Sequence, residues 1–379
     1  MGNRTWLVTI ILFFISLIIF NITSAGNTAY NHFVLLADAM NHGKIYIEVD
    51  MPWLEKIPIN STKFFVANPP MPAIISMIPV LFLGRELPQQ VLSHIFGAIS
   101  VAIVFLIAIK IKNNLKLAIW AAILFGFGTL NWYLISVGST WYMAQIVGQM
   151  FLLLAIFVKL KKISPMVSGL FLGFAYFCRI PIIFTFPFFI FDLPKPWFKN
   201  LILFSLGVLP SIILNSIYNY LRFGVIWDIG YTLIPGVSTE PWYQKGVIHP
   251  SYIIEHLKII FLGLPRINDI LSFKPSVFGY AIWFTTPAFI FSIFNNIKEK
   301  FVWSSWLSIL LISLLIFSHG STGFSQFGYR FAADFYPILL YLTITGVNRF
   351  NGPKLIHWVF LSISVLVNFW GVYSLNIFG

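Results

Sequence analysis

Apolar runs of about twenty residues recur from one end of the chain to the other, and this repetition limits the fold more than any other feature. A run of that length is what an α-helix needs to cross the hydrocarbon core of a bilayer. Composition agrees, since 58% of the 379 residues are hydrophobic and only 9% are charged, whereas soluble domains carry about 25% charge. The sequence therefore excludes a soluble enzyme. It predicts an all-α, polytopic membrane protein that forms a single transmembrane domain over residues 1–379.

Eleven segments are long and apolar enough to be predicted as transmembrane helices. They are residues 6–22, 90–110, 115–135, 142–160, 165–178, 181–194, 199–218, 276–296, 301–318, 331–348 and 354–376. The first follows Arg4 and could be read as a signal peptide, but no small-residue cleavage pattern stands out, so we expect a retained span. A further run, 69–84, holds four prolines, whose missing N–H groups would leave backbone carbonyls unpaired in lipid.

The distribution of Lys and Arg decides on which side of the membrane the proline-rich run lies. With the N-terminus in the cytoplasm and this run on the outer side, every dense basic loop falls inside, as the positive-inside rule requires. These loops hold Arg4, Lys110, Lys112, Lys116, Lys159, Lys161, Lys162, Lys195, Lys199, Lys298, Lys300, Arg349 and Lys354. Orientation thus explains the net charge of +12, and no nucleic-acid partner is implied. We expect a multi-pass protein of the plasma membrane with a cytoplasmic N-terminus and the proline-rich run at the outer interface.

Two long polar stretches emerge on the outer side, residues 23–89 (the first outer segment) and 219–275 (the second outer segment). In the first, apolar side chains recur every three to four residues between Tyr30 and His42, which predicts an amphipathic helix in the membrane surface. This helix places Asp38 and His42 one turn apart. Either the two side chains merely meet water, or Asp38 acts as a base with His42 beside the substrate.

After that helix come three more acids, Glu48, Asp50 and Glu55, which fall within a stretch of eight residues. Carboxylate oxygens bind hard cations such as Mg or Mn, and a carboxylate can also take the proton of an attacked hydroxyl. Asp38, Glu48 and Asp50 could therefore hold a divalent cation, and Asp38 or Asp50 could be a base. A solvated loop explains Glu48 and Glu55 equally well. No other cofactor is implied, because Cys178 is the single cysteine and no phosphate-cradling glycine loop is present.

Three arginines fall at the predicted outer ends of spans, at the depth of a lipid phosphate. They are Arg179, Arg222 and Arg330, and the planar guanidinium fork matches phosphate oxygens. Each one singly is also explained as a side chain that snorkels to the interface. Lys63 is a weaker candidate of the same kind. Asp334 follows Arg330 by four residues, so we expect the two to pair on a helix.

Four regions of the chain share a pattern with a known family. They read YNHFVLLADAMNHGKIYIE with FFVANPPMPAIISMIPVLFLG in the first outer segment, GLFLGFAYFCRIP at 169–181, NSIYNYLRFGVIWDIGY at 215–231 and QFGYRFAADFYPILL at 326–340. In this order they resemble polytopic glycosyltransferases of the C superfamily, related to protein O-mannosyltransferases and the aminoarabinose transferase of lipid A (family 39-like). The resemblance implies a polyprenyl-phosphate-linked sugar as donor, and a glycan, glycolipid or protein as acceptor on the outer face.

The resemblance also implies an acid near the exit of the first span, where this sequence has Asn27 and Asn31. Two functions follow. The first is an integral-membrane glycosyltransferase, in which Asp38 or Asp50 is the base and the three arginines hold the departing phosphate. The second is a non-catalytic lipid-glycan binding protein, scaffold or flippase of the same fold, which the two asparagines favour. Tyr218 could stack on a sugar in either case, although an interfacial aromatic belt explains it equally well.

Overall fold

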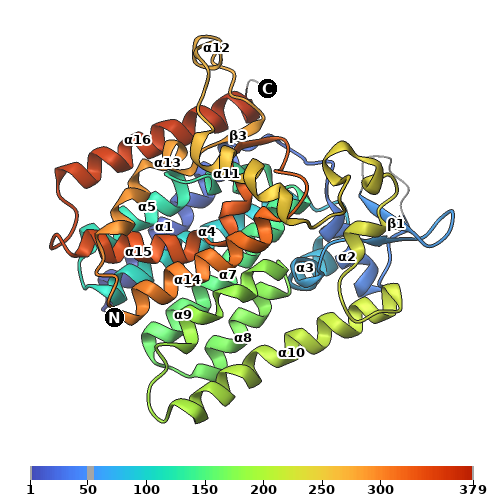
Figure 1. Ribbon diagram of the computed structural model, residues 1–379, viewed down its shortest axis with the longest axis horizontal. Coiled ribbons are helices and arrows are strands. Elements are labelled where there is room, and N and C mark those ends of the chain that lie inside the picture. Colours follow the sequence, from blue (N-terminus) through green and yellow to red (C-terminus); the bar gives the residue numbers. More distant parts are fainter. Residues whose placement is uncertain (1, 49–54, 378–379) are drawn as a thin grey trace.

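The computed structural model describes residues 2–48 and 55–377, most of which are helical. The long helices run side by side in one bundle, and the elements of the first outer segment lie at one end of it (Figure 1). The α-helices are α1 (Asn3–Ile22), α2 (His32–Asn41), α3 (Met71–Leu83), α4 (Gln89–Ile111), α5 (Leu115–Phe127), α6 (Asn131–Val137), α7 (Thr140–Lys161), α8 (Pro165–Tyr176), α9 (Phe186–Ile190), α10 (Trp197–Phe223), α11 (Ile253–Leu262), α12 (Ile267–Leu271), α13 (Ile282–Thr285), α14 (Lys300–Phe317), α15 (Tyr336–Asn348) and α16 (Leu355–Val372).

Short 3-10 segments and one π-helical turn connect or extend these helices. They are η1 (Ile180–Thr185), η2 (Gly230–Leu233), η3 (Val237–Thr239), η4 (Pro241–Tyr243), η5 (Pro250–Tyr252), η6 (Pro287–Phe294), η7 (Arg330–Asp334) and the π-helical η8 (Tyr373–Ile377). Two small sheets complete the described fold. Strand β1 (Lys56–Pro58) pairs antiparallel with β2 (Phe64–Val66), and β3 (Phe278–Tyr280) pairs parallel with β4 (Gln326–Gly328). The all-α prediction therefore holds only in the coarser form of a mostly helical protein.

Six helices in the described part of the chain are long and apolar enough to cross a membrane: α1, α4, α7, α10, α14 and the stretch Leu355–Asn376, which contains α16. Helices α5 and α6 make a seventh if they count as one span, since they pass together but are bent by 54°. The protein is thus a multi-pass membrane protein, but the prediction of eleven full-length spans is wrong. The other four predicted segments contain α8, η1 with α9, α13 with η6, and η7 with α15.

Proline explains most of this difference. Pro181, Pro187, Pro287 and Pro337 each stand in the first turn of a shorter helix, namely η1, α9, η6 and α15. A proline fits the first turn of a helix but does not continue the helix before it, because it lacks the N–H and its ring clashes with a carbonyl. A count of apolar residues treats the sequence on both sides of each proline as one run. It therefore overestimates the length of continuous helix.

The two helices expected in the first outer segment are present, and one face of α2 is covered by neighbouring helices. The proline-rich run forms α3, whose 13 residues are fewer than the roughly 20 that cross a bilayer. The predicted amphipathic helix is α2, but its residues from His32 to Ala37 are all buried. It packs against α3 and the start of α7, and its position at the membrane surface stays a prediction.

The exterior of the bundle is apolar, as lipid contact requires. Large exposed side chains such as Ile10, Phe14, Leu214 and Leu366 cover α1, α10 and α16, whereas nearly every residue of α15 is buried. Helices α8 and α10 approach so closely that a Cβ on Gly207 would lie 2.0 Å from the backbone oxygen of Met166. Small residues that let backbones touch are typical of helix pairs in membranes.

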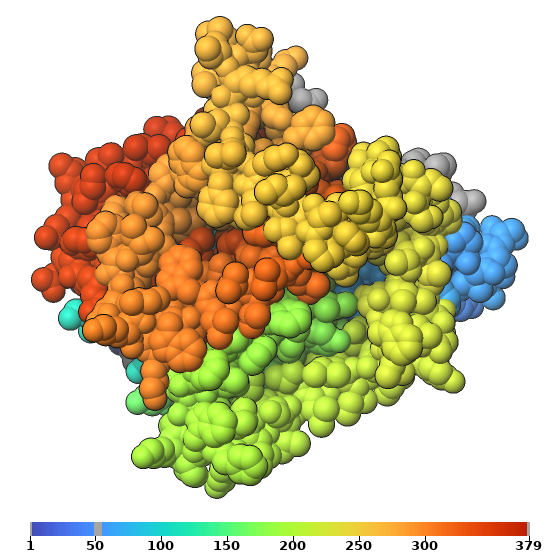
Figure 2. Space-filling model, in the orientation of Figure 1, coloured from blue at the N-terminus to red at the C-terminus, as the bar shows by residue number. Residues whose placement is uncertain are grey.

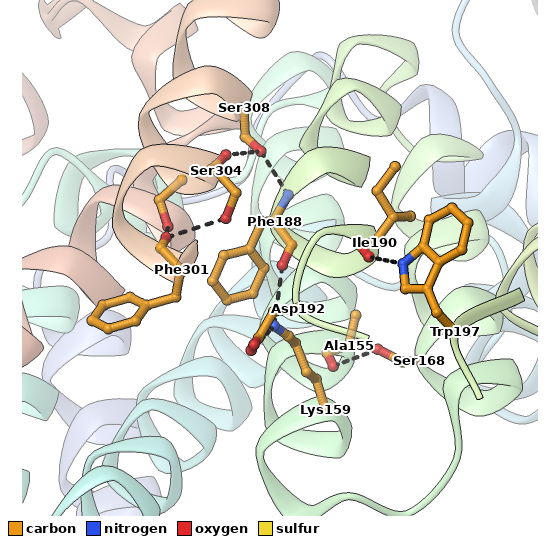
Figure 3. Close-up of polar contacts among 11 residues, drawn as sticks. Ala155, Lys159, Ser168, Phe188, Ile190, Asp192, Trp197, Phe301, Ser304 and Ser308 are labelled. Carbon is orange, nitrogen blue, oxygen red and sulfur yellow. Dashed lines mark hydrogen bonds and ion pairs between the residues drawn. The ribbon is translucent and has the colours of Figure 1, made fainter. Parts of the chain in front are cut away.

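Polar contacts hold the short helix α9 at the end of the bundle away from the first outer segment (Figures 1 and 3). Lys159, at the end of α7, donates to the carbonyl of Phe188 at 3.1 Å and to Asp192 at 3.0 Å. Ser308 on α14 accepts from the backbone N–H of Phe188 at 3.1 Å and donates to the carbonyl of Ser304 at 2.9 Å. Because a helix this short leaves most of its end groups unpaired, these side chains supply the partners.

Candidate functional site

The first turns of α7 bring together side chains from distant parts of the chain. Trp141 donates its indole N–H to Oε2 of Glu55 at 2.9 Å. The ring centroid of Tyr142, the next residue, lies 5.6 Å from the guanidinium carbon of Arg330. Gln145, one turn further, donates to the backbone carbonyl of Arg330 at 2.8 Å. Helix α7 thereby places Glu55 of the first outer segment near Arg330, which precedes α15.

Opposing effects act on the pKa of the Glu55 carboxyl. Burial raises its pKa above the ordinary value, because desolvation disfavours the charged form. The hydrogen bond from Trp141 and the positive charge of Arg330 act in the opposite direction. A mostly buried carboxyl beside a cation, with a perturbed pKa, is typical of a catalytic acid or base.

The guanidinium of Arg330 makes no hydrogen bond or ion pair with the residues that the structure describes. Its hydrogen bonds to described residues are made by its backbone, and its Nε is buried without a partner among them. The side chain rests over the rings of Tyr142 and Phe331. A guanidinium offers five N–H donors, and burying a cation without acceptors costs free energy. These surroundings are compatible with a phosphate ligand, and the role of Arg330 on a phosphate stays a prediction.

Arg179 is paired with Asp334 instead of being free. Its Nη2 lies 2.8 Å from Oδ2 and its Nε lies 3.2 Å from Oδ1, which makes a bidentate pair. The expected pairing of Asp334 with Arg330 is wrong. Residues 330–334 form the 3-10 helix η7, and in that geometry positions i and i+4 no longer lie above one another.

We expect Asp334→Asn to lower the free energy of unfolding by about 3 kcal/mol, because it leaves Arg179 without its buried counter-charge. The Asp334 side chain is 0% exposed and that of Arg179 is 22% exposed. Thermal unfolding in detergent measures the effect. The double replacement Arg179→Met with Asp334→Leu, which removes both charges, is expected to recover most of the loss. An unchanged unfolding temperature in Asp334→Asn would contradict the structural role of this pair.

Arg222 and Tyr218 belong to a neighbouring cluster at the end of α10. Arg222 is buried, its Nη1 donates to the carbonyl of Val66 at 2.5 Å, and its Nη2 donates to Oδ1 of Asn219 at 2.7 Å. The Tyr218 ring centroid is 3.9 Å from the guanidinium carbon. These contacts tie α10 to β2. The roles of Arg222 on a phosphate and of Tyr218 on a sugar stay predictions.

His256 and His319 each have a tautomer that is fixed by a hydrogen bond to a backbone carbonyl. His256 Nε2 lies 2.7 Å from the carbonyl of His319 and must donate, so its Nδ1 accepts from the Tyr329 hydroxyl at 2.6 Å. His319 Nδ1 donates to the carbonyl of Ser321 at 2.9 Å, which leaves Nε2 as an acceptor, 3.4 Å from the Tyr243 hydroxyl. Burial, and to a lesser extent nearby positive charges, lower the pKa of His319 to about 4. The ring is thus neutral at pH 7.

The predicted residues Asp38, His42 and Glu48 line a different polar hollow, which Lys44 and Arg85 also line. His42 Nδ1 lies 2.8 Å from the backbone carbonyl of Asp38 and 3.8 Å from its Oδ1. Lys44 pairs with Glu48 at 2.7 Å. The contacts among the described residues do not join Asp38 to any of the three predicted arginines. Its role as a base stays a prediction, without the expected arginine beside it.

Asp50 lies outside the described residues, so its roles as base and cation ligand stay predictions. Within residues 2–48 and 55–377, no three His, Cys, Asp or Glu side chains gather closely enough to hold a metal ion. The Mg or Mn site expected from Asp38, Glu48 and Asp50 is therefore untested. Lys63 Nζ lies 5.0 Å from the ring centroid of Tyr46, and its role on a phosphate is untested as well.

Acidification is expected to destabilise the protein through His32, which is fully buried at the start of α2. The Thr140 hydroxyl donates to the carbonyl of Tyr30, so it accepts from His32 Nδ1 at 2.8 Å. Burial first, and then the charge of Lys56, lower the pKa of His32 from 6.5 to about 4. The unfolded chain therefore binds a proton that the folded chain does not. Stability is complete above pH 6.5 and falls by about 3 kcal/mol as the pH approaches 4.

The measurement is the unfolding temperature across that pH range for the wild type, His32→Gln and the exposed-site control His42→Gln. We expect the slope to become shallower in His32→Gln and to stay unchanged in the control. Equal acid sensitivity of the wild type and His32→Gln would contradict the assignment. His319, whose pKa is lowered to a similar value, accounts for part of the slope that remains.

The fold is similar to that of an oligosaccharyltransferase from Archaeoglobus fulgidus, solved as a crystal structure in the apo form. The TM-score is 0.53 at 13% identity, and the match covers 98% of this chain and 55% of that one. A structure of the archaeal oligosaccharyltransferase AglB from the same organism, in complex with an inhibitory peptide and a dolichol-phosphate, gives 0.46 at 11% identity, over 99% and 55%. This chain thus spans about half the length of both. No protein-family model and no curated protein matches it.

Proposed function

We propose that the protein is an integral-membrane glycosyltransferase that moves a sugar from a polyprenyl-phosphate donor to a glycan, glycolipid or protein on the outer face of the membrane. The similarity in fold to an oligosaccharyltransferase supports this proposal, as does the resemblance of four regions to the C superfamily. The observation that carries it is the guanidinium of Arg330, which has no acceptor within residues 2–48 and 55–377 and lies close to the Glu55 carboxyl.

In the proposed reaction Arg330 binds the donor phosphate. The bond between the anomeric carbon and the phosphate oxygen breaks, its electron pair stays on the phosphate, and the guanidinium stabilises the resulting charge. The acceptor hydroxyl oxygen bonds to the anomeric carbon, and its proton passes to Glu55. His319 accepts a hydrogen bond from a sugar hydroxyl through its unprotonated Nε2. Glu55 thus takes the role that the sequence assigns to Asp38 or Asp50.

The surroundings of Glu55 do not suit a divalent cation. An indole N–H donates to the carboxyl, and the charge that acts on it most directly is a guanidinium, whereas hard cations prefer a shell of oxygen ligands. The proposed step is therefore not routed through a metal. The cation expected at Asp38, Glu48 and Asp50 is a separate proposal, tested by chelation followed by addition of Mg or Mn.

The experiment is a transfer assay with purified protein in lipid nanodiscs. Polyprenyl-phosphate sugars labelled in the sugar are supplied with and without acceptors, and release or transfer of the label is measured. Turnover that depends on Glu55 and Arg330 is expected. Reporter tags at Arg4 and Asn60 test the cytoplasmic N-terminus and the outer position of the first outer segment.

The second candidate function, binding of a lipid-linked glycan without chemistry, has its own structural observation. The stretch where the resemblance implies an acid has Asn27 and Asn31 instead. Asn27 accepts a hydrogen bond from Gln90 at 2.8 Å, and Asn31 precedes α2. Both residues therefore contribute to the local structure. Saturable binding of the donor, with no release of sugar in the presence of any acceptor class, would favour this second function over transfer.

A further inference from the structure

A narrow projection joins α11 to β3 and stands clear of the bundle. It comprises residues 264–277, which we call the finger, and it contains α12 (Figures 1 and 2). Four of its apolar side chains are exposed: Ile267 by 75%, Ile270 by 55%, Leu271 by 79% and Phe273 by 54%. Apolar groups gathered on one projection indicate a surface that is covered in use, because water contact with them is unfavourable.

The finger is built to hold these side chains in place. Oδ2 of Asp269 accepts from the backbone N–H of Arg266 at 2.9 Å and from the Tyr280 hydroxyl at 2.9 Å. The Tyr280 hydroxyl in turn accepts from the backbone N–H of Ser276 at 2.7 Å. One buried tyrosine therefore fixes both sides of the finger at its base.

Phe273 anchors the finger to the end of the last span. Its backbone has φ of +56°, a conformation that bulky residues rarely adopt. Its ring centroid lies 6.3 Å from that of Trp370 and 6.2 Å from that of Tyr373. These aromatic contacts show that the finger has a defined position relative to α16.

Lipid is the occupant that the surroundings favour. The finger projects across the direction of the long helices and not along it (Figure 1), and a projection in this direction would run along a membrane that those helices cross. Its apolar surface continues onto exposed Phe261 and Leu262 of α11 and Trp283 of α13. Arg266 and Lys274 border the apolar tip on either side. Apolar tips flanked by basic and aromatic residues are typical of segments at the boundary between headgroups and acyl chains.

We propose that the finger inserts into the bilayer surface. Ile267, Ile270 and Leu271 enter the upper acyl region, and Arg266 and Lys274 bind the phosphates of the surrounding headgroups. The inserted finger fixes the depth at which α11 and β3 sit. Since β3 pairs with β4, two residues before Arg330, it also fixes the level of the candidate site. This proposal does not depend on the activity of the site.

The single cysteine makes the test direct, because Cys178 is buried and its replacement by Ala gives a background without thiols. Leu271→Cys in that background is labelled with an environment-sensitive fluorophore and placed in nanodiscs of phosphatidylcholine and phosphatidylglycerol. We expect blue-shifted emission and quenching by lipids that carry a nitroxide near the carbonyl region. Ser61→Cys, on the exposed turn between β1 and β2, is the matched control and is expected to report water.

Quenching of the Leu271 label only by a water-soluble nitroxide would overturn the proposal. So would shielding that appears in vesicles and disappears in nanodiscs holding one copy, because the occupant would then be a second copy of the chain. A further arm keeps the test independent of the label. Arg266→Gln with Lys274→Gln is expected to weaken the preference of the finger for phosphatidylglycerol over phosphatidylcholine, at unchanged unfolding temperature.

Discussion

Arg330→Gln is expected to lower the rate of sugar transfer by about 10²- to 10³-fold, the range found when one preorganised donor to a developing anion is removed. Arg330 is the predicted arginine whose guanidinium has no acceptor among the described residues, so its loss removes a ligand without breaking an internal ion pair. The unfolding temperature should therefore change little. Replacing Arg330 should thus lower activity without lowering stability, whereas breaking the ion pair of Arg179 should lower stability.

Two companion variants sharpen the result. Arg330→Lys keeps the charge and loses the planar fork, so an intermediate rate is expected. Arg349→Ala removes an arginine that pairs with Glu299 in the connection before α14, and its rate should equal the wild type. Because the charge of Arg330 lowers the pKa of Glu55, the acid limb of the pH–rate profile should move to higher pH in Arg330→Gln. Full activity in that variant would refute a phosphate role for this residue.

Glu55→Gln is expected to reduce transfer by about 10²- to 10⁴-fold, the usual contribution of a positioned general base. The amide keeps the size and can still accept the hydrogen bond from Trp141, so the fold should be retained. Activity of the wild type should fall as the pH drops through the raised pKa of Glu55, because only the ionised form takes a proton. That acid limb should be absent from the residual activity of Glu55→Gln.

The matched control is Glu86→Gln, an exposed acid from the same outer segment that lies beside Arg85. Its rate and pH profile should match the wild type. Asp38→Asn and Asp50→Asn test the roles that the sequence assigns to those residues. If either abolished transfer while Glu55→Gln left it intact, the base would have to be sought outside the Trp141 cluster.

Sequence alone predicted a multi-pass, mostly helical membrane protein, because this class depends on composition and on a local pattern. The sequence did not show which of the three arginines has a partner within the protein, because those partners lie far away along the chain. Arg179 forms an ion pair with Asp334, because the 3-10 geometry of η7 turns that carboxylate away from Arg330. Glu55 looked like a solvated acid because its partner Trp141 lies 86 residues away, and no local pattern reports such a contact.

The predicted number of transmembrane spans was wrong for a different physical reason. Hydropathy measures how readily side chains leave water, and it is nearly blind to the missing N–H of a proline. Helices η1, α9, η6 and α15 each have a proline in the first turn. Buried among other helices, as α15 is, a short segment needs no contact with lipid along its full length.

The bidentate pair of Arg179 and Asp334 also constrains the order of assembly. The two residues are separated by 155 positions, so during synthesis the arginine leaves the ribosome long before its counter-ion exists. The half-built chain must keep that guanidinium in contact with water or phospholipid until η7 is made. Truncation before Asp334 would therefore leave Arg179 without its counter-charge.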